Sequence, residues 1–161
     1  MNFQVEYAPS KAECGCVNTV DFLGILENEN MTPRARIIAL QKAMVELGGE
    51  QGDCYPLEHR FAPGTYARTI RMPAGSLVIG KIHKFACVNI VTKGKATVWT
   101  EYGKKEIKTG DIWISDPATQ RVVLNHEDTE WTTIHQNPDN LSDPYILEDQ
   151  IISVSIIGTE L

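Results

Sequence analysis

Between residues 57 and 136 the chain consists of short segments rich in β-branched and aromatic residues, separated by glycine, proline and aspartate. Segments of this kind predict β-strands joined by turns. We expect strands at 57–61, 65–72, 76–83, 87–91, 95–102, 104–108, 111–114, 121–125 and 131–136. Many short strands without intervening helices predict a mostly β protein, either a sandwich or a barrel.

One helix is predicted ahead of the strands, over residues 33–47. Thr32 is a favourable N-cap, Pro33 suits the first helical position, and the Gly48-Gly49 pair provides a stop. An apolar stripe at helical spacing consists of Ile37, Leu40, Met44 and Leu47. We interpret this stripe as a face packed on the sheet, and a surface for a partner is the alternative.

The 161 residues fit one domain. We expect this domain to cover residues 32–161, after an irregular N-terminal arm at 1–31. Within the arm, only a short strand or turn is expected, at 20–26. Near the other end, a helix followed by a strand is predicted over 143–157, with the helix at 143–152.

Composition and charge argue against several classes of protein. The net charge of −6 argues against broad binding of nucleic acid or of an anionic membrane surface. No apolar run approaches the roughly 20 residues that span a bilayer, and the first residues do not resemble a signal peptide. The four cysteines are too few and too irregularly spaced for a disulfide framework, which predicts reduced thiols in a cytoplasm.

Three of the cysteines suggest one possible metal site. Cys14-Gly-Cys16 is one residue shorter than the usual CxxC spacing. Together with Cys54 and His59 this pair could form a zinc site, because thiolate and imidazole are the ligands that zinc prefers. A segment without metal is the alternative.

The stretch from Gly80 to Gly94 gathers the reactive side chains of the predicted strands. It carries Lys81, His83 and Cys87 between apolar runs. Because alternate residues of a strand point the same way, Lys81 and His83 share a face, and Cys87 returns to it after a turn. These polar groups are therefore predicted to face a pocket rather than open water.

The order of glycines, prolines and strands resembles the cupin superfamily, the small double-sheet jelly rolls. The first cupin motif contains an HxH pair, then a glutamate and a closing glycine. On this chain Gly94 matches the closing glycine and His83 the second histidine. Lys81 stands at the position of the first histidine, and Cys87 at that of the glutamate.

The second cupin motif runs from a glycine through a turn proline to a histidine. Gly110 and Pro117 match its first two positions with one extra residue between them, and the expected histidine falls near Arg121 or Val122. A narrower similarity, to small cupin-like proteins of phages and prophages, is carried by the phrases at 59–68, 73–75, 80–83 and 126–135.

This resemblance implies a double-stranded β-helix, or jelly-roll barrel, with its core at 57–136, an N-terminal arm and one or two peripheral helices. It also implies a homodimer or higher homo-oligomer, because cupins commonly pair through sheet edges and swapped terminal strands. Exposed strand edges give a physical reason for such pairing. A phage-encoded member would act in the host cytoplasm.

A metal-binding cupin normally offers three histidines and a glutamate to iron, manganese, nickel or zinc. In this chain the resemblance leaves His83, with Cys87 as a substitute ligand and His135 on a neighbouring strand as a third. Imidazole and thiolate together suit zinc, copper or iron. One hypothesis is therefore a metal-dependent enzyme of dioxygenase or isomerase type. The alternative is that no metal binds and Cys87 packs as a small hydrophobe.

Lys81 points to a different chemistry, because an ammonium group repels a cation and attracts an anion. With Arg68 and Arg121, and with His83 in the same pocket, it could hold a carboxylate or phosphate, while Tyr66 or Trp131 stacks on a ring. The favoured hypothesis is a protein that binds an anionic small molecule such as a nucleotide, a sugar or an organic acid, a host metabolite or signal if the chain is phage-encoded. For the two arginines, exposed positions on strands are the alternative.

Overall fold

The structure, a computed structural model, describes residues 5–7, 19–48, 50–51 and 55–153. Its helices are α1 (Thr19–Leu26), α2 (Pro33–Glu46) and α3 (Pro144–Ile151). Its strands are β1 (Val5–Tyr7), β2 (Glu50–Gln51), β3 (Leu57–Ala62), β4 (Gly64–Met72), β5 (Leu77–Ile79), β6 (Ile82–His83), β7 (Cys87–Lys93), β8 (Lys95–Thr100), β9 (Gly103–Lys108), β10 (Ile112–Ser115), β11 (Val122–Asn125), β12 (Thr129–Asn137) and β13 (Ile152–Ser153). Among the described residues, no helix combines the length and apolar character needed to cross a bilayer.

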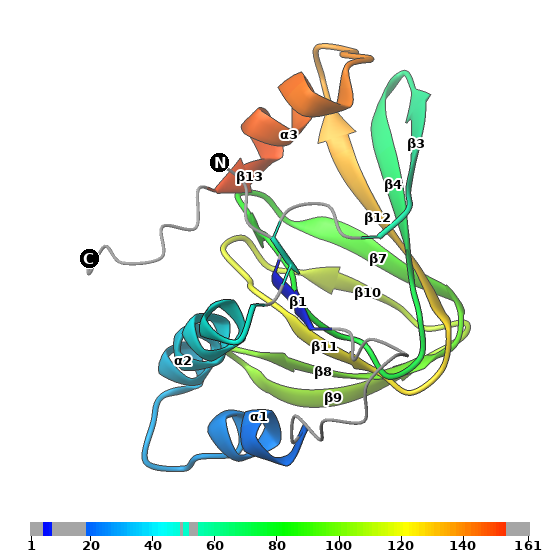
Figure 1. Cartoon of the computed structure of the whole chain (residues 1–161). Coiled ribbons are helices and arrows are strands. Elements are labelled where there is room, and N and C mark those ends of the chain that lie inside the picture. The colour runs from blue at the N-terminus through cyan, green and yellow to red at the C-terminus, as the bar shows by residue number, and fades with distance from the viewer. Residues whose placement is uncertain (1–4, 8–18, 49, 52–54, 154–161) are drawn as a thin grey trace.

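Two antiparallel sheets enclose the main core (Figure 1). One has the strand order β2-β1-β5-β11-β8-β9, and the other has the order β10-β7-β12-β4-β3. From β4 onward the chain passes directly from one sheet to the other between β4 and β5, β7 and β8, β9 and β10, β10 and β11, and β11 and β12. This exchange makes a double-sheet jelly roll, so the predicted mostly β fold is confirmed. Residues from both sheets pack between them: Met72, Val78, Val91, Ala96, Val98, Ile107, Val123 and Trp131.

The strand predicted at 76–83 is divided into β5 and β6. The Gly80 amide donates to the carbonyl of Arg121 (2.8 Å), and β6 then pairs with β13 rather than continuing in the six-stranded sheet. The break places Lys81 and His83 at the cavity between the sheets. The other predicted strands are present, with ends that differ by one or two residues.

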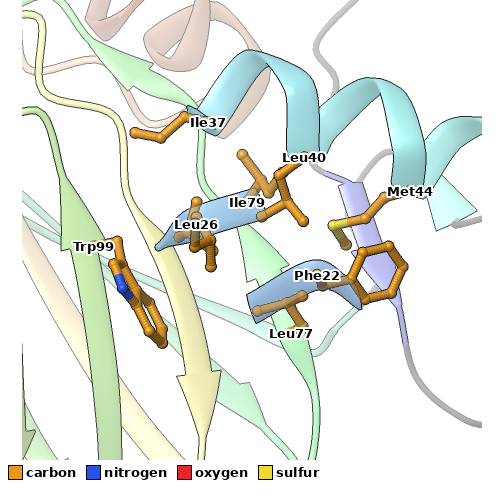
Figure 2. Close-up of a cluster of buried hydrophobic side chains, with 9 residues drawn as sticks. Phe22, Leu26, Ile37, Leu40, Met44, Leu77, Ile79 and Trp99 are labelled. Carbon is orange, nitrogen blue, oxygen red and sulfur yellow. The ribbon is translucent and has the colours of Figure 1, made fainter. Parts of the chain in front are cut away.

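Helix α2 packs on the six-stranded sheet, as its apolar stripe predicts. The Thr32 hydroxyl accepts a hydrogen bond from the Ala35 amide (3.2 Å), and Gly48 beyond the helix has φ of +81°. Leu47, predicted to belong to the stripe, instead follows the last helical turn and is 56% exposed. Figure 2 shows the buried side chains that pack together between the helices and the sheet: Phe22, Leu26, Ile37, Leu40, Met44, Leu77, Ile79 and Trp99.

The N-terminal segment predicted to be irregular contains two regular elements. Strand β1 pairs with β5 and β2, which makes it part of the six-stranded sheet. Residues 19–26 form helix α1, where a short strand or turn was expected. Phe22 and Leu26 lie four residues apart, so a helix brings both onto the core beneath α2. Strand β1 and helix α1 therefore pack with the six-stranded sheet and with α2.

The C-terminal helix predicted at 143–152 is confirmed as α3. Asp143 caps it, because its Oδ1 accepts from the Tyr145 amide (2.9 Å), and Leu147 and Ile151 are buried. The predicted strand after it begins as β13, and its remainder lies outside the described residues. The proposed zinc ligands Cys14, Cys16 and Cys54 also lie outside them.

Candidate ligand pocket between the sheets

The inner face of the five-stranded sheet changes from apolar to polar along its strands. Successive rows of opposed residues are Val91–Trp131–Ile70, then Asn89–Thr133–Arg68, then His135–Tyr66. Opposed side chains on one face of a sheet are in contact range. The register alone therefore gives the pocket an apolar floor at Trp131 and a polar mouth at Arg68 and His135.

The six-stranded sheet and the β5–β6 break supply the opposite wall. Together the two walls enclose a cavity of about 50 Å³. It is lined by Arg68, Ile70, Met72, Val78, Gly80, Lys81, His83, Arg121, Val123, Trp131 and Thr133. Five of the six residues predicted to bind a ligand thus line one cavity, while the sixth, Tyr66, lies one row further out.

A carboxylate from helix α3 neutralises part of the positive charge at the mouth. Glu148 Oε1 accepts from both Lys81 Nζ (2.5 Å) and Arg68 Nη1 (3.0 Å). Sequence reasoning missed Glu148, because a single acid on a short helix gives no signal until the helix is placed over the barrel. Its contacts fix α3 to the pocket.

Arg121 lies under the cavity rather than on the surface. It is 7% exposed, its Nη2 donates to Ser115 Oγ (2.6 Å) and to Cys87 Sγ (3.6 Å), and its guanidinium lies 5.5 Å from the centre of the Trp131 ring. Burial is the main cause that lowers the pKa of Arg121. The Arg68 side chain is only 11% exposed. The alternative of exposed strand charges is therefore wrong for both arginines.

His83, Cys87 and His135 come together as predicted. His83 Nδ1 lies 3.4 Å from Cys87 Sγ, and the two imidazole rings meet edge to face at 4.9 Å. All three donor atoms lie within 4.8 Å of one another, and all three residues are buried. Sequence spacing predicted the His83–Cys87 pair, and the antiparallel pairing of β12 with β7 adds His135.

Both imidazoles are held in their neutral form at pH 7. Burial lowers the pKa of His83 well below 6.5, and the charge of Arg121 lowers it further. Burial, with Arg68 and Arg121, lowers the pKa of His135 to about 4. The positive charge of the pocket therefore comes from its arginines and lysine.

Asn89 and Ser115 support the buried polar groups and were not predicted. Asn89 Nδ2 donates to Ser115 Oγ (2.8 Å), and Asn89 Oδ1 accepts from Trp131 Nε1 (3.2 Å). Ser115 Oγ in turn accepts the hydrogen bond from Arg121 Nη2. The signal for Asn89 was its position two residues after Cys87, which places it on the same strand face.

These residues permit a metal, with one obstacle. From bond lengths of about 2.0–2.3 Å, neighbouring ligand atoms of tetrahedral zinc lie about 3.3–3.8 Å apart. The His83–Cys87 distance of 3.4 Å meets this spacing, and the widest separation in the group, up to 4.8 Å, exceeds it by about 1 Å. Neutral imidazoles also leave lone pairs for a metal. The obstacle is Arg121, a cation 3.6 Å from the sulfur.

Strands β4, β5 and β7–β12, exchanged between two sheets around a polar cavity, form a double-sheet jelly roll, an architecture that also occurs in cupins. The jelly-roll fold that the resemblance implies is thus confirmed. No family model and no curated protein matches the sequence.

Several solved structures are similar to this fold. A cupin-2 domain protein from Shewanella frigidimarina is 11% identical and aligns over 50% of this chain and 80% of its own, with a TM-score of 0.41. A putative ethanolamine utilization protein Q from Salmonella typhimurium is 13% identical and aligns over 54% of this chain and 72% of its own, with a TM-score of 0.45. Salicylate 1,2-dioxygenase from Pseudoaminobacter salicylatoxidans is 13% identical and aligns over 66% of this chain and 32% of its own, with a TM-score of 0.48. The resemblance to phage proteins stays a prediction.

Proposed function

We propose that this cupin binds a small anionic ligand, with the anionic group held at the cationic mouth of the pocket. The observation that carries the proposal is the charge balance. Arg68, Lys81 and Arg121 bring three positive charges, and Glu148 is the one carboxylate that contacts them within the described residues. Because His83 and His135 are neutral, the groups of this pocket that attract an anion are the two guanidinium groups and the ammonium group.

The size of the inner cavity limits what can enter it. A single water needs about 10–15 Å³ of such volume, so the cavity of about 50 Å³ holds a few waters or one carboxylate or phosphate group. Pockets that enclose a whole ligand are about 300–1,000 Å³. The inner cavity therefore suits the charged group of an organic acid or nucleotide and excludes the rest of the molecule.

Thermal shift with sodium phosphate and sodium acetate tests this proposal. A bound anion stabilises the folded state by mass action, so we expect the melting temperature of the wild type to rise with anion concentration. Arg68→Ala and Lys81→Ala should lose this response. Arg60→Ala is the matched control, because Arg60 lies on β3 with a 54% exposed side chain. Retained anion binding in both pocket variants contradicts the proposal.

We propose as the second candidate a metal-dependent enzyme of dioxygenase or isomerase type, in which His83, Cys87 and His135 hold zinc, iron, manganese or nickel. The observation that favours it is the cluster of three buried donors. A bound metal would supply a Lewis acid or a redox centre. Metal content measured by mass spectrometry on untagged protein should then be stoichiometric and absent in His83→Ala. Full activity in metal-free His83→Ala protein rules this candidate out.

We also propose that the chain forms a homo-oligomer through the outer face of the five-stranded sheet. Two rows of opposed side chains cross this face: Ile112–Ile90–Thr132 and Ile114–Val88–Ile134. Ile112 and Ile114 on edge strand β10 are 67% and 70% exposed. Contiguous exposed apolar surface and an uncovered edge favour pairing with a second copy, because a two-fold axis brings the same patch of both copies together.

A cytoplasmic location is proposed from the cysteines. Cys87 is buried as a free thiol beside His83, a state that a reducing compartment maintains. If the chain is phage-encoded, that compartment is the host cytoplasm, and the ligand is a host metabolite or signal.

A further inference from the structure

A groove adjoins the inner cavity, between the β3–β4 hairpin and helix α3. Figure 1 shows α3 at the same end of the molecule as this hairpin. The groove has a volume of about 320 Å³. Its walls are Tyr55, Leu57, His59, Tyr66, Arg68, Pro144, Tyr145 and Glu148.

The groove and the inner cavity meet at the Arg68–Glu148 ion pair. Arg68 lines both spaces. Glu148 lines the groove and also contacts Lys81, which lines the inner cavity. A ligand in the groove therefore has its nearest cation at Arg68, and a carboxylate there takes the place that Glu148 Oε1 now occupies.

Aromatic rings form much of the groove wall. His59 and Tyr66 are stacked at 5.9 Å with an interplanar angle of 8°, and the Tyr66 hydroxyl lies 2.7 Å from His59 Nδ1. This contact fixes the orientation of both rings. Tyr145, on α3 at the opposite wall, is 77% exposed and can cover a ring that enters.

We propose that the groove binds the ring of a monocyclic aromatic carboxylic acid whose carboxylate reaches Arg68. The inference rests on the proposed anion site and adds the class of ligand. A volume of about 320 Å³ lies within the range of about 300–1,000 Å³ for ligand pockets. Flat aromatic walls favour a planar ring, and a guanidinium pairs with a carboxylate through parallel hydrogen bonds.

The aromatic walls predict that an aromatic acid binds more tightly than a saturated acid of the same charge and similar size. Aromatic pairs contribute about 0.5–1.5 kcal/mol beyond the burial of their area, which corresponds to about two- to tenfold in affinity. Benzoate should therefore bind about two- to tenfold more tightly than cyclohexanecarboxylate, which has the same charge and a similar volume. Acetate, which reaches only the anion site, should bind at least tenfold more weakly than benzoate.

An NMR titration of the full chain with acetate, cyclohexanecarboxylate and benzoate tests the inference. In Tyr145→Ala we expect benzoate to bind several-fold more weakly and acetate to bind as in the wild type. Tyr102→Ala is the matched control, because Tyr102 is also exposed (73%) but lies outside the groove, beside the β8–β9 turn. Both tyrosines are on the surface, so neither change should prevent folding.

The outcomes separate this inference from the proposed function. Equal affinity for benzoate and acetate, or an unchanged benzoate affinity in Tyr145→Ala, overturns the aromatic groove and leaves the anion site standing. Absence of binding for all three acids overturns both. Benzoate binding that survives Arg68→Ala overturns the link between the groove and the anion site.

Discussion

His135 shows how the pocket changes the behaviour of a single residue. Tyr66 stacks on one side of its ring at 6.0 Å, and Thr133 Oγ1 lies 3.1 Å from its Nε2. The side chain is 4% exposed, so there is little water to solvate an imidazolium. Arg68 and Arg121 add repulsion, and the pKa falls to about 4.

This lowered pKa predicts how stability depends on pH. In the unfolded chain a histidine titrates near 6.5. Between pH 6.5 and 4 the unfolded state therefore binds a proton that the folded His135 does not, and stability is lost as the pH falls. A difference of this size corresponds to about 3 kcal/mol at most. Urea denaturation of chelator-treated protein at pH 7, 5.5 and 4 should show this loss.

Carboxylates also titrate in this range, so a variant separates their contribution. His135→Gln retains a polar side chain and has no imidazole to protonate. The difference in unfolding free energy between wild type and His135→Gln should change by up to about 3 kcal/mol between pH 7 and pH 4. A constant difference across this range contradicts the assignment of a low pKa to His135.

At the scale of elements, the β7–β8 turn depends on Gly94. Its φ is +91°, and a Cβ there would lie 2.8 Å from Thr129 Cα and also meet the carbonyl of Asp128. Gly110, before β10, has a similar φ of +94°, but nothing lies within 4 Å of its Cβ position. The two glycines share the backbone conformation and differ in the space around them.

We therefore expect Gly94→Ala to be more destabilising than Gly110→Ala. A left-handed conformation costs an alanine about 1–2 kcal/mol at either site. At Gly94 the neighbouring strand must also move, which adds about 1–3 kcal/mol, as in other overpacked sites. Chemical denaturation of both variants measures the difference. Equal losses contradict the close approach of the two backbones at Gly94.

Helix α3 is attached by Glu148 as well as by Leu147 and Ile151. Glu148→Gln removes the carboxylate that Lys81 and Arg68 share, and removal of one partner of a buried ion pair typically costs about 3–5 kcal/mol. Hydrogen exchange in residues 144–151 should accelerate. Phosphate or acetate should bind more tightly, because the competing carboxylate is gone.

Asp149→Asn is the matched control for this change. Asp149 is the next residue on the same helix, and its side chain is exposed. The Asp149→Asn substitution should leave both hydrogen exchange and anion binding as in the wild type. If Glu148→Gln behaves like this control, Glu148 does not hold α3 at the pocket.

For the whole molecule, the two faces of the five-stranded sheet have different roles. The inner face carries the polar pocket, and the outer face carries two rows, apolar except for Thr132, that end at Ile112 and Ile114. The proposed assembly buries the outer face and leaves the α3 end of the pocket open.

Ile114→Lys should weaken this assembly, since a charge cannot be buried at an interface without a partner. Light scattering coupled to size-exclusion chromatography should show a lower mass than for the wild type. Ile146→Lys is the control, because Ile146 is 53% exposed and lies on α3 rather than in either row of the outer face. A wild-type mass equal to that of one chain contradicts the proposed assembly.

Local patterns determined the fold class and most of the elements. Strand composition, turn residues, the Thr32 cap and the apolar stripe of α2 act over a few residues, so they can be recognised in a single sequence. Strand periodicity also placed Lys81, His83 and Cys87 on one face. The structure differs from the predictions at β1 and α1, at the break between β5 and β6, and at Leu47. Helix α1 was missed because its two anchors, Phe22 and Leu26, are recognisable only against the core that covers them.

Only the tertiary structure decided the chemistry of the pocket. Burial of Arg121, the low pKa of His135 and the contacts of Glu148 depend on groups that are distant in sequence. Register across the sheet brings His135 to Cys87, and the helix after the last long strand brings Glu148 to Lys81. The sequence by itself therefore determined which strands form and which way their side chains point. Charge balance, cavity size and the neighbouring groove follow from packing, which no local pattern encodes.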